Sequence, residues 1–269
     1  MSEFYGTPMD QLKQLMARLR HPTQGCPWDK EQTFETVAPY TIEEAYEVED
    51  AIARKDSNAI CEELGDLLLQ IVFHSRMAEE QGLFDFDEVA TRITEKMIER
   101  HPHVFGKESL RTQSFQSQAW EDQKNRERNK KNNGPSGILD GVAPNLPALM
   151  YSEKLIKRVK RTGIDPTDFK SVQRKIFKTL LNKKVPNPKN DKKKNETWIG
   201  EMFFLLTHLS VHLGVDSEKS LRETSRKFKK YLDRLEKNSL IKKEESIEKS
   251  NGEKKTNQPL IYENFMQID

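Results

Sequence analysis

The 269-residue sequence contains only two cysteines and no long apolar run. Two cysteines in a chain of this length do not form a disulfide framework, which favours a reducing compartment. The apolar stretches are shorter than the about 18 residues that a membrane-spanning helix needs. No basic segment followed by an apolar one stands at the start of the sequence. We therefore expect a cytoplasmic, soluble protein with no signal peptide and no membrane partner.

Signals for β-strands are scarce as well. Alternation of apolar and polar residues is nearly absent, whereas apolar residues recur at helical spacing. Charged residues make up 33% of the chain and hydrophobic residues 35%, which is polar but not as depleted as a disordered protein. The formal net charge of +2 gives no overall attraction to nucleic acid. The sequence predicts an all-α protein.

Helix start and stop signals divide the first half of the chain into four segments. Thr41, with Glu44 three residues later, fits a capping box, and Asp56 or Ser57 can cap the next helix. His101 and Pro102 form a helix stop. The predicted helices cover residues 9–19, 41–54, 57–81 and 85–100.

A run of Asn, Gly, Pro and Ser over residues 132–137 predicts a linker. It separates a predicted N-terminal domain, residues 1–131, from a predicted C-terminal domain, residues 138–236. Residues 237–269 carry mixed charges and few apolar side chains, which is typical of disorder. The chain is therefore expected to hold two helical domains and a disordered tail.

Acidic residues with helical spacing stand out in the N-terminal half. Glu43, Glu44 and Glu47 share one helix face, and Glu63 and Asp66 share another. Like charges placed this way repel each other unless something neutralises them. If the two helices pack antiparallel, the carboxylates converge, and oxygen ligands of this kind suit Mg²⁺. The spacing alone leaves a second interpretation open, in which each acidic face is simply exposed to solvent.

Four sequence elements occur in a fixed order: GCPWD at 25–29, EEAYE at 43–47, ELGD at 63–66 and RHPHVFG at 100–106. With this order and spacing, the segment from about residue 9 to 106 closely resembles MazG-type nucleoside triphosphate pyrophosphohydrolases. The resemblance implies tandem helical domains built on a four-helix core, in a homodimer. It also implies hydrolysis of nucleoside triphosphates to monophosphate and pyrophosphate with Mg²⁺, or with Mn²⁺ in its place, in clearing the nucleotide pool.

The resemblance also implies roles for single residues. Glu43 resembles an acid that orients water, and the metal ligands implied are Glu44, Glu47, Glu63 and Asp66. Lys96 and Arg100 suit the triphosphate, because fixed cations stabilise charge that develops on phosphoryl oxygens. A basic helix end that complements its own dipole is the other interpretation of these two residues. Trp28 suits stacking on a nucleobase, although it would equally serve to anchor its loop in the core.

The second half repeats the pattern weakly but loses its carboxylates. Residues 177–181 read FKTLL where the family has EExxE, and residues 198–201 read WIGE where the family has ExxD. Lys178 thus stands at a metal-ligand position. Tyr231 stands at the position equivalent to Arg100, so this cation is lost, whereas Lys227 stands at the position equivalent to Lys96. We predict a degenerate, catalytically inactive C-terminal domain.

Two other functions remain open at this point. The chain can be a catalytically inactive nucleotide-binding or regulatory protein of the same fold, which would bind Mg²⁺ and nucleotide without releasing pyrophosphate. The basic stretch from Lys183 to Lys194 suggests nucleic-acid binding as a second possible function, but it has no interleaved aromatic residues. We therefore do not expect nucleic acid to be a partner.

Overall fold

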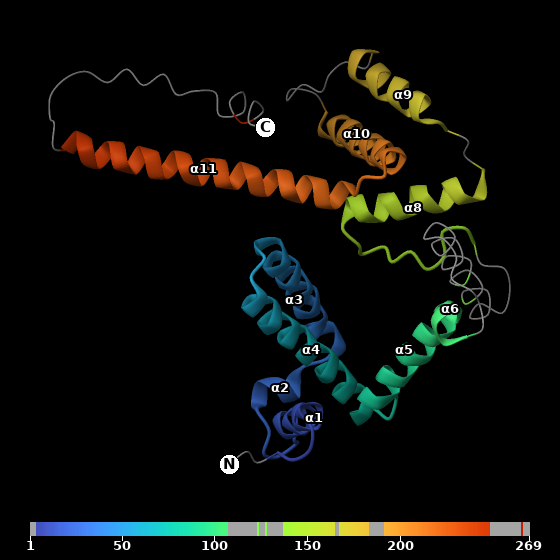
Figure 1. The fold of residues 1–269 in the computed structure, drawn as a ribbon, viewed down its shortest axis with the longest axis vertical. Helices are drawn as coiled ribbons and strands as arrows, with labels where there is room; N and C mark the ends of the chain where they lie inside the picture. The colour runs from blue at the N-terminus through green and yellow to red at the C-terminus, as the bar shows by residue number, and fades with distance from the viewer. Residues whose placement is uncertain are drawn as a thin grey trace. The chain divides into compact units, whose positions relative to one another are not determined.

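The computed structural model describes residues 4–106, 137–164, 167–182 and 191–247, with the single residues 123, 127 and 265. All regular structure in these ranges is helical (Figure 1), which confirms the all-α class. The chain divides into two compact units, residues 1–123 and 124–269. The predicted linker lies outside the described residues except at Gly137, so its boundaries stay a prediction.

The first unit is built around a helical hairpin. Its helices are α1 (Pro8–Leu19), α2 (Pro27–Glu31), α3 (Phe34–Arg54), α4 (Ser57–Glu80), α5 (Phe86–Arg100) and α6 (Pro102–Phe105). The contact between α3 and α4 is the most extensive one between described helices, and α1 packs on α4. Figure 1 shows α5 leaving the end of α4 at a wide angle to the hairpin.

Side-chain caps explain most of the helix starts. The carboxylate of Asp56 accepts backbone N–H bonds at the start of α4, as predicted, and the carboxylate of Asp85 accepts one at the start of α5. The predicted start of α3 at Thr41 is wrong. Thr33 caps this helix instead, and Pro39 lies inside it. The hydroxyl of Thr41 instead forms a hydrogen bond of 3.0 Å with Nε2 of His74 on α4.

The core of the first unit lies at the end of the hairpin away from its turn. Met16 of α1, Val37 of α3 and Val72, Phe73 and Met77 of α4 are buried together there. At the other end only Lys55 and Asp56 connect α3 to α4, and Lys55 adopts a left-handed conformation with φ of 59°. The two helices are therefore antiparallel, and their polar middle lies between the core and the turn.

The second unit contains four described helices: α8 (Ala148–Thr162), α9 (Phe169–Asn182), α10 (Lys192–Leu213) and α11 (Ser217–Ile247). α10 contacts each of the other three, and a core of Val172, Ile176, Met202 and Leu205 joins it to α9. α11 continues to Ile247, so the start of the segment predicted to be disordered, residues 237–269, is helical as far as residue 247. Apart from Phe265, residues beyond 247 lie outside the described residues.

No described helix alone has both the length and the apolar composition that crossing a bilayer needs. α10 and α11 meet these criteria only as a pair, and they are bent by 107° at the break between them.

Candidate metal centre

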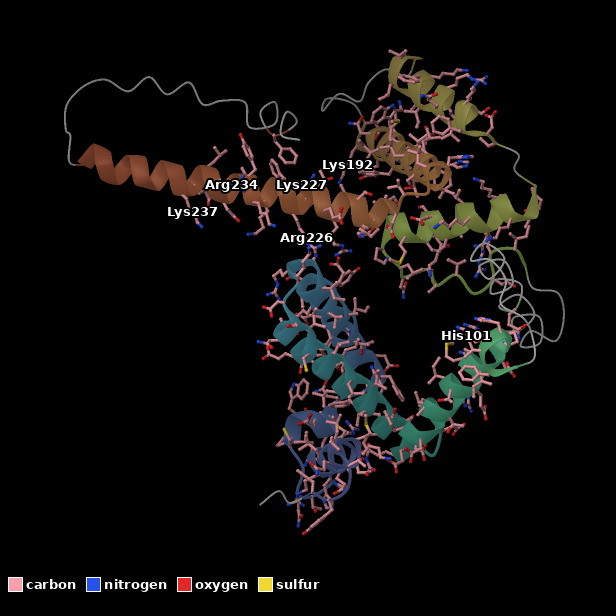
Figure 2. The ribbon with its side chains drawn as sticks, in the orientation of Figure 1. His101, Lys192, Arg226, Lys227, Arg234 and Lys237 are labelled. Atoms are coloured by element: carbon pink, nitrogen blue, oxygen red, sulfur yellow. The ribbon has the colours of Figure 1, made fainter. Side chains whose placement is uncertain are left out.

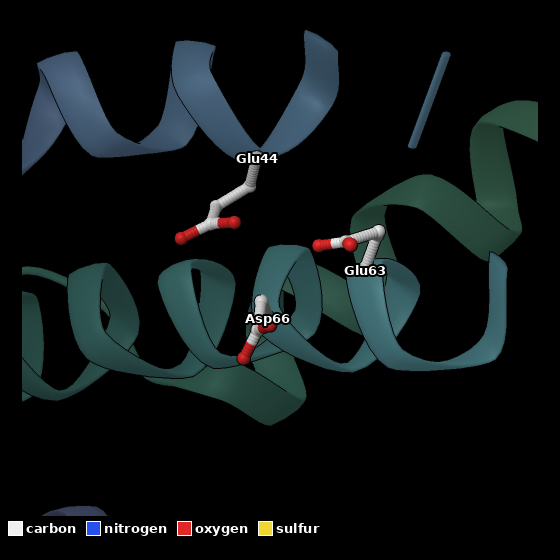
Figure 3. Close-up of side chains that lie close together, drawn as sticks. All are labelled: Glu44, Glu63 and Asp66. Carbon is white, nitrogen blue, oxygen red and sulfur yellow. The ribbon is translucent and has the colours of Figure 1, made fainter. Parts of the chain in front are cut away.

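Carboxylates from α3 and α4 converge in the polar middle of the hairpin (Figure 3). Glu44 on α3 and Glu63 and Asp66 on α4 each offer a carboxylate oxygen, and these oxygens lie within 4.8 Å of one another. Glu63 and Asp66 are one helical turn apart, so the same face of α4 presents both to α3. The structure thus brings together three of the four predicted metal ligands.

The fourth predicted ligand, Glu47, lies next to this group of three. Its carboxyl is close enough to Glu63 for a side-chain hydrogen bond, which contributes to raising the pKa of Glu63. Glu43 acts on Glu44 through its charge. Both Glu43 and Glu47 are exposed. All five predicted acids therefore belong to one electrostatic cluster, although only three of them form the compact ligand set.

No Lys or Arg in the described part of the chain forms an ion pair with the carboxylates of this cluster. Burial raises the pKa of Glu44 most, and the negative charges of Asp66 and Glu47 raise it further. Burial and the neighbouring Glu47 likewise raise the pKa of Glu63. The side-chain amide of Gln70 donates a hydrogen bond of 3.4 Å to Glu44, which only partly opposes the rise. An all-oxygen set with unrelieved repulsion fits a hard divalent cation.

A row of polar side chains continues from the carboxylates along α4. Asp66, Gln70 and His74 follow at four-residue intervals, so they share the face toward α3. The His74 ring stacks on Phe34, with centroids 5.7 Å apart, and its burial lowers its pKa. Sequence reasoning missed Gln70 and His74, although their spacing from Asp66 was a usable signal.

Trp28 lies on the exposed surface of the first unit. It is 52% exposed, so it is not anchored in the core. Its ring meets that of Tyr40 edge-on, with centroids 6.3 Å apart and planes at 69°. Tyr40 precedes Glu44 by four residues on α3, so these two side chains leave the same face of the helix about one turn apart. Sequence reasoning did not identify Tyr40.

Lys96 and Arg100 lie on the last two turns of α5 and are half-buried. Among the helices that the structure describes, α5 contacts chiefly α4 and α6. Because α5 points away from the hairpin (Figure 1), a single chain does not place these cations over the carboxylates. Their role with the triphosphate stays a prediction.

The described part of the second unit contains no comparable cluster of three metal-ligating side chains. Tyr231, at the position of Arg100, packs its ring 6.0 Å from that of Phe265. Figure 2 labels several cations along α11, among them Lys227, Arg234 and Lys237. Acidic side chains lie between such cations, and Asp233 pairs with Lys229 at 3.1 Å. This helix has a mixed charged surface rather than a purely basic one.

Comparison with known proteins agrees with the helical hairpin and its carboxylates. The model of the MazG nucleotide pyrophosphohydrolase domain matches residues 32–105, which include every acid of the cluster. The chain is 42% identical over 224 residues to a nucleoside triphosphate pyrophosphohydrolase of Escherichia coli K12, covering 82% of this chain and 84% of the relative. It is 38% identical over 248 residues to the nucleoside triphosphate pyrophosphohydrolase/pyrophosphatase MazG of Thermotoga maritima, covering 91% and 93%.

The fold and the cluster thus define an all-helical hydrolase of the metal-dependent kind. The chain belongs to the MazG nucleotide pyrophosphohydrolase family. A third relative, the uncharacterized protein YabN of Bacillus subtilis, is 35% identical over 241 residues, which are 88% of this chain and 47% of that protein.

Proposed function

We propose that the first unit hydrolyses nucleoside triphosphates to monophosphate and pyrophosphate, and that it removes unwanted nucleotides from the cytoplasmic pool. The observation that carries this proposal is the convergence of Glu44, Glu63 and Asp66 with their repulsion unrelieved. The relatives from E. coli and T. maritima, which this chain matches over most of its length, are named for this activity.

Magnesium is the ion that we propose for the cluster, with manganese as a substitute. Glu44, Glu63 and Asp66 would hold it, with Glu47 beside them. When bound, such an ion polarises a phosphoryl oxygen and lowers the pKa of a water. The exposed carboxylate of Glu43 accepts a hydrogen bond from the attacking water and orients it toward the α-phosphorus. The bond between the α-phosphorus and the bridging oxygen breaks, and pyrophosphate leaves.

We further propose that the protein is a homodimer in which α5 of each copy lies on the hairpin of the other. Large apolar side chains are exposed on both surfaces: Ile42 and Leu64 on the hairpin, and Ile93 and Ile98 on α5. Burying such side chains favours association. This arrangement would bring Lys96 and Arg100 of one copy to the carboxylates of the other, where they compensate the charge of pyrophosphate.

The activity is tested by incubating the full chain with canonical and deaminated nucleoside triphosphates and Mg²⁺, and measuring pyrophosphate and orthophosphate separately. We expect pyrophosphate and the monophosphate in equal amounts, and we expect Asp66→Asn to lose the activity while keeping its helical circular dichroism. Orthophosphate as the sole product would contradict attack at the α-phosphorus. Nucleotide binding without any product would support the inactive alternative.

Shared sites are tested by mixing two inactive variants, Asp66→Asn and Lys96→Ala, and letting the subunits exchange. A mixed dimer retains one intact site only if the carboxylates and the cations come from different copies. We therefore expect activity to return on mixing, and sedimentation to give the mass of a dimer. A monomer, or a mixture that stays inactive after verified exchange, would contradict the shared arrangement.

A further inference from the structure

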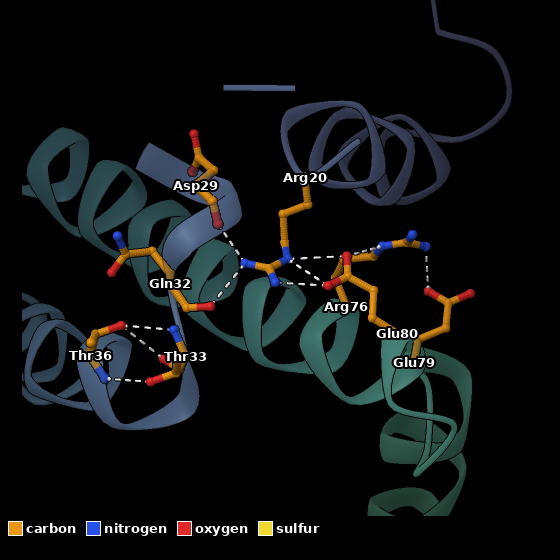
Figure 4. Close-up of polar contacts among 8 residues, drawn as sticks. All are labelled: Arg20, Asp29, Gln32, Thr33, Thr36, Arg76, Glu79 and Glu80. Atoms are coloured by element: carbon orange, nitrogen blue, oxygen red, sulfur yellow. Dashed lines mark hydrogen bonds and ion pairs between the residues drawn. The ribbon is translucent and has the colours of Figure 1, made fainter. Parts of the chain in front are cut away.

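The segment between α1 and α3 is held by one buried side chain, Arg20, whose side chain is 8% exposed (Figure 4). Its guanidinium donates hydrogen bonds to the backbone carbonyls of Asp29 and Gln32, the latter at 3.2 Å. It also donates to both carboxylate oxygens of Glu80 on α4: Nε lies 3.1 Å from Oε1, and Nη2 lies 2.8 Å from Oε2. The guanidinium carbon lies 5.4 Å from the ring centroid of Phe73. Arg20 thus joins the loop to the core.

The backbone of this segment is folded tightly against the end of α1. The N–H of Cys26 donates a hydrogen bond of 2.8 Å to the carbonyl of Leu19, and that of Gly25 donates to His21 at 2.9 Å. A Cβ atom on Gly25 would lie 2.3 Å from the Leu19 oxygen. The segment therefore has a fixed path, and α2, which carries Trp28, begins directly after it.

The result of this fixed path is a pair of exposed aromatic rings, of which Tyr40 shares a face of α3 with Glu44. Trp28 is 52% exposed and Tyr40 42% exposed, and they meet edge-on. Exposed aromatic rings can stack on a nucleobase, and stacking tolerates any base because each has a flat face. One helical turn separates Tyr40 from Glu44, and in a nucleotide a ribose separates the base from the α-phosphate. A base stacked on Tyr40 can therefore have its α-phosphate near Glu44.

We propose that Arg20 is a positioning residue for nucleobase binding, because it holds the loop at which Trp28 and Tyr40 form the stacking surface. This inference rests on the proposed function and deepens it. This surface distinguishes nucleobases by the area of their rings and not by the hydrogen-bonding groups along their edges. Purine nucleoside triphosphates therefore bind more tightly than pyrimidine ones, and a deaminated purine binds about as well as its parent.

The test separates binding of the base from binding of the phosphates. KM and kcat for ATP are measured on the full chain, together with the inhibition constant of inorganic tripolyphosphate, which has no base. Trp28→Ala is expected to raise KM by about 5- to 150-fold, the range for loss of one stacked base. Arg20→Lys, which keeps the charge but loses the planar fork, is expected to raise KM as well. In both variants kcat and the inhibition constant of tripolyphosphate stay unchanged.

Arg76→Lys is the matched control, because Arg76 pairs with the same Glu80 at 2.9 Å but makes no described contact with the loop. It should leave KM for ATP unchanged. The proposal is overturned if Trp28→Ala leaves KM for ATP unchanged. It is also overturned if Arg20→Lys raises the inhibition constant of tripolyphosphate by as much as it raises KM for ATP. Thermal melting checks that Arg20→Lys folds, and Trp28→Ala changes an exposed side chain only.

Failure of the proposed function itself would give a different result, namely no pyrophosphate from the wild-type protein. Calorimetry with a non-hydrolysable ATP analogue and with tripolyphosphate then replaces the kinetic constants. Weaker binding of the analogue alone in Trp28→Ala supports the stacking surface. Equal binding of the analogue to the wild type and Trp28→Ala overturns it.

Discussion

Gln70 of α4 donates a hydrogen bond of 3.4 Å to Glu44 of α3, so a neutral amide contacts one carboxylate of the acidic cluster. Asp66 and Glu47 both raise the pKa of Glu44 through their charge, in addition to the effect of burial. The charged forms of these carboxylates therefore destabilise the hairpin when no cation is bound. A bound cation would remove that cost, so binding and stability are linked at this site.

Glu44→Gln is expected to raise the melting temperature of the protein in chelator, because it removes a disfavoured charge. It should also reduce pyrophosphate release by more than the roughly 10- to 100-fold typical of losing an outer-shell partner. Thermal melting with and without Mg²⁺ and the pyrophosphate assay check both parts. Glu99→Gln, an exposed position on α5, is the control. A lower melting temperature of Glu44→Gln in chelator would contradict the explanation.

The stability gained from Mg²⁺ should depend on pH. The pKa values of Glu44 and Glu63 are raised above the ordinary 4.5, so their contribution to metal-free stability is largest below 4.5 and is lost as pH rises through the folded values. Metal binding needs the deprotonated forms, and protons compete with it. The rise in melting temperature with Mg²⁺ should be larger at about pH 8 than at about pH 5. An equal rise at both would contradict this.

Glu80→Gln should destabilise the first unit by about 1–3 kcal/mol. Burial acts to raise the pKa of Glu80, but hydrogen bonds from Arg20 and Arg76 outweigh it and hold the pKa below 4.5. The stability from this lowered pKa is present above 4.5 and is lost as pH falls through the folded value. Urea unfolding checks the effect. Glu79→Gln, which pairs with Arg76 alone at 2.9 Å and is exposed, should cost less than about 1 kcal/mol.

Two glycine-to-alanine substitutions should change the stability of the protein in opposite directions. Gly25→Ala places a methyl group 2.3 Å from a backbone oxygen, which should cost about 1–3 kcal/mol and disturb the Trp28 loop. Gly200→Ala fills a helical position of α10 with no described atom within 4 Å, and should stabilise by about 0.5–1 kcal/mol. Thermal melting of the two variants gives the signs directly. A stabilised Gly25→Ala would show that the loop is not tightly packed.

Local signals in the sequence predict much of the first unit. Asp56 caps α4 as predicted, because a cap depends only on the residues that follow it. The spacing of Glu63 and Asp66 predicts a shared face for the same reason. The antiparallel packing that brings Glu44 to them follows from the short connection between the helices.

Long-range features were not predictable in this way. Arg20 and Glu80 are 60 residues apart, and nothing in the sequence near either residue indicates that they pair. The start of α3 was missed because Thr33 and Thr36 form a reciprocal cap that lacks the acidic residue of the usual pattern. The first turn of α5 likewise makes long-range contacts, because Phe86 packs against the core and Asp87 pairs with Lys13 of α1 at 2.8 Å.

The two-residue turn at Lys55 and Asp56 has a consequence for how the site is formed. All the carboxylates lie between residues 43 and 66, so bringing them together closes a short loop at a low entropic cost. Contacts this local form early when a chain folds. The compact ligand set therefore needs no residue of α5 or of the second unit. An ion bound there would join α3 to α4 across their turn.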